Sequence, residues 1–267
     1  MSQIRIIPLF SGSSGNCTYV CADGINLLFD IGKNCKQTLI AMEKAGIDPS
    51  IIDGVFITHS HGDHIAGVDV FIRKYPSKLY GTRQTLNYIN RRCSKPHVDT
   101  PDICVTSGET IVLSDTVEII PLDTPHDAAG SVCYKVIAGD KSAMIMTDLG
   151  FVTDNLISFI KGVDGALIES NYDERMLVYG SYPDELKARI AGRGGHISND
   201  ECAVLIENMI NSGARKFILA HLSEENNTPR KAHDTVDCYL RSKSFDPMND
   251  YHLDVASRHE PSEGFEL

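Results

Sequence analysis

The stretch THSHGDH at residues 58–64 directly follows a short apolar segment at residues 55–57. It holds three imidazoles and one carboxylate within six residues, and Zn²⁺, Mn²⁺ and Fe²⁺ all accept such ligands. Neighbouring histidines repel one another when protonated and add nothing to core packing. We therefore predict that this stretch binds metal and that the fold is arranged around it.

Other apolar segments of the chain also lead into a potential metal ligand. Those ligands are Asp30, His126, Asp148 and His221. If the segments are strands of one sandwich, their ends meet at one rim and bring the ligands together. The sequence thus predicts a site assembled from distant parts of the chain.

We predict two divalent metal ions at this site, Zn²⁺ or Mn²⁺, with Fe²⁺ as a further candidate. The expected ligands are His59, His61 and His126 for one ion, and Asp63, His64 and His221 for the other. Asp148 would bridge the two ions, and Asp30 would orient a ligating imidazole through its far nitrogen. Two ions about 3.5–4 Å apart convert a bridging water into hydroxide near neutral pH and neutralise charge on a phosphoryl oxygen.

Length and composition are those of an ordinary globular protein. The chain has 267 residues, of which 42% are hydrophobic, and we expect one hydrolase domain over residues 1–267. No apolar run approaches the roughly 18 residues of a transmembrane helix, so no membrane partner is expected. The eight cysteines form no C-x-x-C pair, which indicates free thiols in a reducing cytoplasm.

Strand-like and helix-like segments alternate along the chain, and its middle is rich in strands. Apolar segments between turn residues predict strands at 4–10, 18–21, 25–29, 54–57, 111–113, 117–121, 131–137, 142–146, 165–168 and 216–220. Helical periodicity predicts helices at 35–45, 65–75, 82–91, 155–160, 183–190, 200–211 and 228–240. Together they indicate an α+β fold with two mixed β-sheets flanked by helices.

The ligands and their flanking residues resemble the metallo-β-lactamase superfamily in content and order. The resemblance rests on THSHGDH and on FDIG at 29–32, TPH at 124–126, MTD at 146–148 and AHLS at 220–223. It spans almost the whole chain and implies an αββα sandwich with a binuclear site at one edge of the sheets. True β-lactamases carry a thiol ligand where this chain has Asp148, so the implied substrate is a phosphodiester or thioester.

Four further segments resemble the bacterial YycJ subgroup of that superfamily, also called WalJ. They are GSSGN at 12–16, ESNYDERML at 169–177, GHISN at 195–199 and HLSEENN at 221–227. The resemblance implies a 5′→3′ exonuclease that acts on nucleic acid, with DNA favoured over RNA. Together with the likeness to the nuclease branch that includes RNase J, it implies catalytic roles for Asp63, Glu169 and His196.

His196 lies in a glycine-flanked loop and is expected to give a proton to the leaving group, with Glu169 keeping it protonated. The alternative is that His196 has only a structural role, as a loop residue that caps a helix. The Gly/Ser stretch at 11–16 offers hydroxyls and backbone N–H groups to phosphate oxygens, although such stretches are usually plain hairpin turns. The expected substrate-binding residues are Ser13, Ser14, Asn16, Asn171, Ser198, Asn199, Ser223 and Asn226.

Net charge of −11 argues against broad electrostatic adhesion to nucleic acid, but it allows a local basic groove. Basic residues gather in one part of the sequence, where the ordinary alternative is a solvated surface. They are Arg73, Lys74, Lys78, Arg83, Arg91, Arg92 and Lys95.

Three other functions stay open from the sequence. A glyoxalase II-like thioesterase would share all seven ligands, and a small-molecule or cyclic phosphodiesterase would use the same chemistry. A sensor protein could retain metal without turnover. The oligomeric state is left undetermined.

Overall fold

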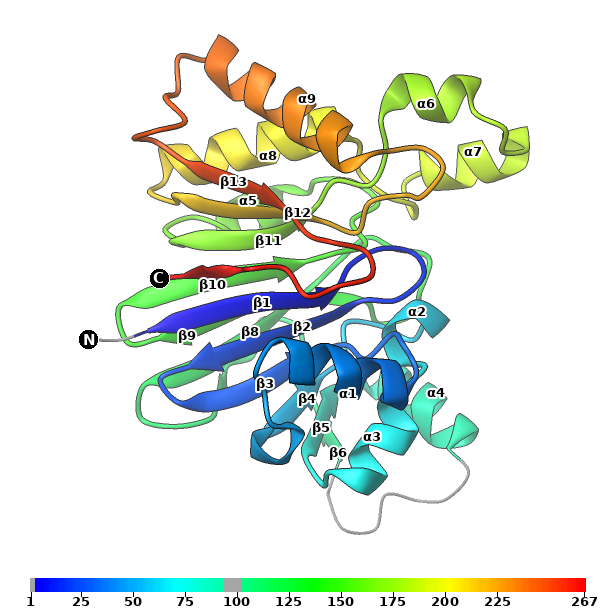
Figure 1. Ribbon diagram of the computed structural model, residues 1–267, viewed down its shortest axis with the longest axis vertical. Helices are drawn as coiled ribbons and strands as arrows, with labels where there is room; N and C mark the ends of the chain where they lie inside the picture. The colour runs from blue at the N-terminus through cyan, green and yellow to red at the C-terminus, as the bar shows by residue number, and fades with distance from the viewer. Residues whose placement is uncertain (1–2, 94–101) are drawn as a thin grey trace.

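Two β-sheets packed face to face form the centre of the molecule, with helices on both outer faces (Figure 1). The computed structural model describes residues 3–93 and 102–267. This architecture confirms the predicted α+β fold with two mixed sheets, an αββα sandwich. Within those ranges, no helix is both long enough and apolar enough to cross a membrane.

The first sheet carries the N-terminal part of the chain. In spatial order its seven described strands are β14 (Phe265–Glu266), β1 (Ile4–Phe10), β2 (Cys17–Ala22), β3 (Ile25–Phe29), β4 (Gly54–Phe56), β5 (Lys78–Gly81) and β6 (Asp102–Cys104). The strands from β3 to β6 pair in parallel, with Phe29 opposite Phe56. The carboxyl ends of β3 and β4 therefore meet at one edge of the sheet.

The second sheet has the same construction. Its seven described strands are, in spatial order, β13 (His252–Val255), β12 (Lys216–Ala220), β11 (Gly165–Glu169), β10 (Lys141–Met146), β9 (Val132–Ala138), β8 (Val117–Asp123) and β7 (Ile111–Val112). The strands from β10 to β13 pair in parallel. Parallel pairing in register brings the carboxyl ends of β10, β11 and β12 side by side.

Helices cover the outer face of each sheet (Figure 1). On the side of the first sheet lie α1 (Cys35–Lys44), α2 (Gly62–Ile65), α3 (Val68–Lys74) and α4 (Arg83–Arg92). On the side of the second lie α5 (Asp154–Phe159), α6 (Glu174–Tyr179), α7 (Asp184–Ile190), α8 (Asn199–Asn211) and α9 (Pro229–Ser242). Side chains fix several helix starts: Thr82 caps α4, and Ser198 caps α8 in a reciprocal capping box with Glu201.

The core between the sheets also holds the histidine-rich stretch in place. Phe56 stacks on Phe29 and meets Tyr134 of the opposite sheet edge-on, with ring centroids 5.3 and 5.5 Å apart. The hydroxyl of Tyr134 donates to the carbonyl of Ile57 at 2.7 Å, and Val132 N donates to Thr58 O at 3.0 Å. The second sheet thus anchors the backbone that enters the stretch at residues 58–64.

The prediction of one helix over residues 65–75 was wrong, because the segment is interrupted between α2 and α3. Gly67 N donates to Ile31 O at 2.9 Å, and a Cβ on Gly67 would lie 2.3 Å from Lys33 O. The close approach of the loop after β3 therefore breaks the helix. The elements that were not predicted are short ones, namely β5, β6, β13, β14, α6 and the 3-10 turn Pro49–Ile51.

Candidate metal centre

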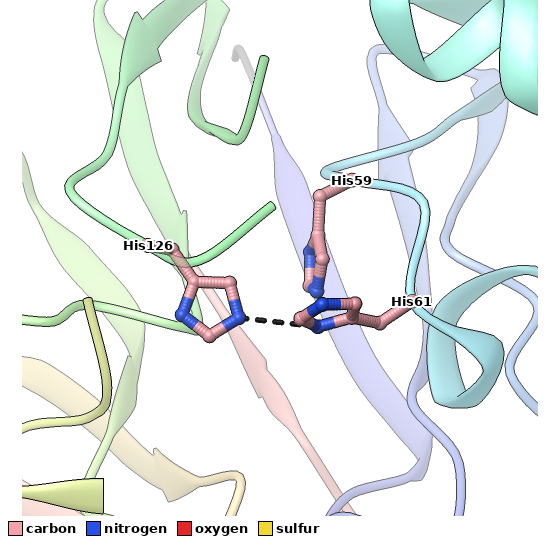
Figure 2. Close-up of side chains that lie close together, drawn as sticks. All are labelled: His59, His61 and His126. Atoms are coloured by element: carbon pink, nitrogen blue, oxygen red, sulfur yellow. Dashed lines mark hydrogen bonds between the residues drawn. The ribbon is translucent and has the colours of Figure 1, made fainter. Parts of the chain in front are cut away.

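The predicted ligands converge on the edge of the sandwich where the parallel strands end. Asp30 directly follows β3, His221 directly follows β12, and Asp148 lies two residues after β10. The stretch at residues 58–64 begins two residues after β4. Figure 2 shows how His59 and His61, from this stretch, face His126, from the loop after β8.

A first cluster consists of His59, His61 and His126. One nitrogen from each ring lies within 4.8 Å of the others, and the ring centroids are 4.7 to 5.0 Å apart. His126 Nε2 is 3.3 Å from His61 Nδ1. Three imidazole nitrogens that face one another at this spacing suit a transition-metal ion.

A second cluster consists of Asp63, His64 and His221, whose ligand atoms also lie within 4.8 Å of one another. Asp148 joins the two clusters: its Oδ2 is 3.2 Å from His64 Nε2, and its Oδ1 is 3.6 Å from His126 Nε2. The same carboxylate groups with His59 and His64 as a third possible ligand set, and with Glu169, His196 and His221 as a fourth. This is the placement that a bridging carboxylate requires.

Buried atoms without a partner test whether these residues suit a cation. Within the described ranges, His59 Nε2, His221 Nε2 and Asp148 Oδ2 are buried and make no hydrogen bond. An unsatisfied buried polar group costs about 1–3 kcal/mol, so three of them in these neighbouring clusters need compensating ligands. The donors are nitrogen and carboxylate oxygen, and divalent cations at the two clusters would satisfy all three.

Asp30 orients His64 directly and His59 through Thr58. Its Oδ2 accepts a hydrogen bond from His64 Nδ1 at 2.8 Å, and it also accepts the Thr58 hydroxyl at 2.8 Å. Thr58 N donates to Asp30 Oδ1 at 2.8 Å. Since a carboxylate can only accept, His64 carries its proton on Nδ1 and turns Nε2 toward the second cluster.

Three residues at the strand ends have left-handed backbone conformations. Asp30 and Asp148 have φ of 60°, and His221 has φ of 53°. This region is uncommon for residues other than glycine and costs free energy that the surrounding structure must supply. The turn it produces at each strand end directs the three side chains into the same small volume.

The two central carboxylates are held ionised. Burial alone would raise the pKa of Asp148, but the facing imidazoles of His221, His64 and His59 lower it well below its usual range. Burial likewise opposes ionisation of Asp63, and His64 and His221 outweigh it and lower its pKa. Both groups therefore offer negative charge to a cation across the physiological pH range.

The pKa values of His59 and His221 shift in opposite directions. Burial and the neighbouring His64 lower the pKa of His59 well below 6.5, so its free nitrogen is available as a ligand. Burial would also lower the pKa of His221, but Asp148, Asp63 and Glu169 outweigh it and raise that pKa to about 10. The high value reports a local excess of negative charge, which metal ions would neutralise in place of protons.

Glu169 connects the centre to His196. Its Oε1 accepts from His196 Nδ1 at 2.8 Å and from His221 Nδ1 at 2.9 Å, while its Oε2 accepts from Leu149 N at 2.8 Å. Burial raises the pKa of Glu169, but His196 and His221 outweigh it and lower it to about 2. The sequence predicted the contact with His196; the shared contact with His221 comes only from the structure.

The predicted substrate-binding residues fall into two groups. Ser13 and Ser14 are exposed at a turn beside the centre, and Asn16 Nδ2 lies 3.0 Å from His64 Nε2. The others are buried and hydrogen-bonded within the protein: Asn171 holds His221 O, Ser198 caps α8, Asn199 binds Ser170 and Asn227, and Ser223 binds Asn226. A direct role in substrate contact stays a prediction for all of them.

Two residues beside the centre were missed. Thr58 links Asp30 to both His59 and His64, with its hydroxyl 3.0 Å from His59 Nδ1. Asp127 Oδ1 lies 3.5 Å from both His61 Nε2 and His126 Nε2, and its Oδ2 accepts from Arg189 Nε at 2.6 Å. Their adjacency to His59 and His126 in the chain was the only available indication in the sequence.

The basic residues between positions 73 and 92 do not gather at one place, so the alternative of a continuous basic groove is not supported. Lys78 begins β5 and pairs with Gly54 at the far end of the sheet from the ligands. Arg73 forms an ion pair with Asp69 at 2.9 Å. Arg92 is well placed, because it lines a cavity of about 450 Å³ together with Ser60 and Gly62 of the histidine-rich stretch. Lys95 lies outside the described residues.

Comparison with known proteins agrees with this geometry. A family model described as the beta-lactamase superfamily domain matches residues 25–222. The exodeoxyribonuclease WalJ of Streptococcus pneumoniae is 35% identical over 239 residues, covering 88% of each chain. The exodeoxyribonuclease YycJ of Bacillus anthracis is 33% identical over 237 residues, covering 89% of each chain.

A solved structure extends the likeness to the fold. The metallo-β-lactamase fold protein YhfI of Bacillus subtilis superimposes with a TM-score of 0.73 over 99% of each chain, at 15% identity. The chain therefore belongs to the metallo-β-lactamase superfamily of metal-dependent hydrolases.

Proposed function

We propose that the protein is a binuclear metal-dependent exonuclease that hydrolyses phosphodiester bonds of DNA in the 5′→3′ direction. The observation that carries the proposal is the convergence of seven nitrogen and carboxylate ligands, three of which have a buried ligand atom without a hydrogen-bond partner among the described residues. The identity of 33–35% to two exodeoxyribonucleases, over nearly nine-tenths of the chain, supports the substrate class.

The ligands of each ion follow from the two clusters. The first ion would bind His59, His61 and His126, the second would bind Asp63, His64 and His221, and Asp148 would contact both. Nitrogen and carboxylate donors without a thiolate suit Zn²⁺ or Mn²⁺. Bound ions would supply an activated water and neutralise charge on the phosphate.

The protein supplies the proton for the leaving oxygen. His196 donates a hydrogen bond from Nδ1 to Glu169, which fixes the ring and leaves Nε2 outside that contact, where it would give a proton to the leaving oxygen. Its side chain is 20% exposed, whereas His221 and Asp148 are each 2% exposed. His196 is therefore the member of this group that a substrate can reach.

A panel of substrates tests the proposal. Protein loaded with Mn²⁺ or Zn²⁺ is given 5′-labelled DNA, 5′-labelled RNA, a cyclic nucleotide, bis-p-nitrophenyl phosphate and S-lactoylglutathione. We expect the labelled 5′-terminal nucleotide to be released from DNA without longer labelled fragments, with slower release from RNA. Turnover of the thioester alone, or of the cyclic nucleotide alone, would replace the proposal, and full metal occupancy without turnover would indicate a sensor.

We propose the cytoplasm as the compartment, and the cysteines support this proposal. No disulfide joins the described cysteines, and Cys17, Cys133 and Cys202 are buried. Proteins of oxidising compartments usually pair such residues, so this pattern supports action in the cytoplasm.

A further inference from the structure

A tight turn beside the metal centre has an exposed tip. Gly15 N donates to Gly12 O at 2.8 Å, which closes the turn, and Ser13 and Ser14 form its exposed tip. Within residues 3–93 and 102–267, neither serine makes a hydrogen bond through its backbone N–H or its hydroxyl. The tip therefore presents several free donors to solvent.

The turn is attached to the second cluster on both sides. Before it, the hydroxyl of Ser11 accepts a hydrogen bond from His221 N at 2.7 Å. After it, Asn16 Nδ2 lies 3.0 Å from His64 Nε2. A ligand on the turn would consequently lie next to the proposed metal ions, and its position relative to them would be fixed.

Two basic side chains pack against the turn, one at each glycine. A Cβ on Gly12 would lie 2.7 Å from Arg258 Nη1, and a Cβ on Gly15 would lie 2.7 Å from Lys33 Cδ. Both glycines also have positive φ, 142° and 149°, which other residues rarely adopt. Lys33 and Arg258 therefore lie close to the two ends of the serine tip.

The two cations are only partly compensated. Arg258 Nη2 donates to Leu222 O at 2.7 Å, whereas its Nη1 is buried without a hydrogen-bond partner among the described residues. Lys33 has no ion pair in the described part of the chain. Glu224 is the nearby acid, but it is 63% exposed and lies 3.9 Å from Arg258 Nη1. Burial and the Arg258 charge lower the pKa of Lys33, as expected for like charges held close together.

We propose that Lys33 and Arg258, with the Ser13–Ser14 tip, bind one phosphate group of the nucleic-acid strand beside the metal centre. The proposal rests on the proposed nuclease function. Two cations and a set of free N–H and hydroxyl donors around one turn are suited to a phosphate. The phosphate could be the 5′-terminal group or an internal diester, and the two differ in charge.

Equilibrium binding tests the site without turnover. Mn²⁺-loaded protein is titrated with fluorescent single-stranded DNA whose phosphorothioate linkages resist hydrolysis, once with a 5′-phosphate and once with a 5′-hydroxyl. The variants are Lys33→Gln, Arg258→Gln and Ser14→Asp, since the last adds a negative charge to an exposed tip without touching the Leu222 contact. Arg5→Gln and Lys161→Gln are matched controls, because Arg5 lies at the start of β1 and Lys161 in the turn before β11, at the ends of the sheets away from the ligands.

We expect each site variant to weaken binding about tenfold or more, while both controls bind like the original protein. The slope of log affinity against log salt concentration should fall by about 0.7–1 for each cation removed. If the terminal phosphate is bound, the 5′-phosphate DNA loses its advantage in the variants; if an internal one is bound, both DNAs weaken equally. Affinities and slopes equal to those of the controls, with unchanged melting temperature, would overturn the proposal.

The outcome is separable from that of the nuclease assay. Binding that depends on Lys33 and Arg258, without cleavage of normal DNA, would keep the site and remove the nuclease. Cleavage with binding unaffected by the variants would keep the nuclease and remove the site. Failure of the original protein to bind either DNA would remove both.

Discussion

Glu169 Oε1 lies 2.9 Å from Nδ1 of His221, and this contact orients an imidazole whose Nε2 is buried without a hydrogen-bond partner among the described residues. A carboxylate that fixes the far nitrogen of a ligating histidine sets both its tautomer and its direction. The same oxygen also contacts His196, so one side chain connects the proposed metal site to the proposed proton donor.

Replacing this carboxylate should weaken metal binding. For Glu169→Gln we expect metal affinity to fall roughly 10–100-fold, because the amide cannot accept from both imidazoles and from Leu149 N. Competition with a chromogenic chelator measures the affinity. Glu207→Gln on α8 is the control, since Glu207 contacts Tyr239 and Lys243, away from the centre, in the part of the chain that the structure describes. Equal affinities for the two variants would contradict the orienting role.

His196 should affect turnover without affecting metal content. For His196→Ala we expect kcat on DNA to fall by about 10²–10⁴, the usual contribution of a positioned acid. The metal content, measured by mass spectrometry, should stay near that of the original protein, because His196 belongs to neither of the two proposed ligand clusters, although it groups with Asp148, Glu169 and His221. His252→Ala serves as control, since His252 pairs with Asp254 on the surface. An unchanged kcat with full metal would remove the proton-donor role.

Removing metal should destabilise the protein. At a metal concentration of 100 Kd, binding adds about 2.7 kcal/mol to the free energy of unfolding, which corresponds to a Tm shift of roughly 5–10 °C. We expect a chelator to lower the Tm by that amount and added Mn²⁺ or Zn²⁺ to restore it. The Asp148→Asn variant should show a smaller shift, because the carboxylate that joins the clusters is lost. A Tm that ignores both chelator and metal would argue against a bound ion.

Two glycines near the site should respond oppositely to alanine. A Cβ on Gly32 would lie 1.7 Å from Asp63 O, so Gly32→Ala must push the metal-binding loop away from β3. We expect a loss of about 1–3 kcal/mol in stability, the usual cost of overpacking. Gly62 begins α2 and a Cβ there meets nothing within 4 Å, so Gly62→Ala should be neutral or more stable by up to about 1 kcal/mol. Thermal melts of both variants measure the difference in stability. Equal Tm values would show that Gly32 and Asp63 O lie farther apart in solution.

Thiol reactivity should separate the cysteines by depth. Burial raises the pKa of Cys133 to about 12 and raises the pKa of Cys17 and Cys202 still further. Because the thiolate is the reactive form, these three should resist a disulfide reagent from pH 7 to 9, while the exposed Cys104 and Cys238 react quickly. Mass spectrometry of the labelled peptides identifies the sites, and unfolding in denaturant should expose the remainder. Rapid labelling of Cys202 in the folded protein would contradict the packing of α8.

Much of the site was predictable because its determinants are local. Three histidines and an aspartate within six residues specify a metal site wherever the chain places them. Apolar segments that end in Asp30, Asp148 and His221 predicted the common rim, since parallel strands with a shared register end together. The alternation of these segments with helical ones was enough for the fold class.

The interruption at Gly67 and the short strands were not predictable in the same way. The break between α2 and α3 depends on contact with Ile31 and Lys33, which belong to another loop. Strands of two to four residues, such as β6 and β14, have too few positions to show a period. Their existence depends on the neighbour that pairs with them.

The sequence by itself determined which chemical groups are present and that they follow strands. The tertiary structure alone decided how they combine: Glu169 shared between His196 and His221, Asp148 between two histidine clusters, and Lys33 and Arg258 beside one turn. The physical reason is distance along the chain. Arg258 and Gly12 become neighbours only after both sheets have packed, and no local sequence pattern predicts that contact.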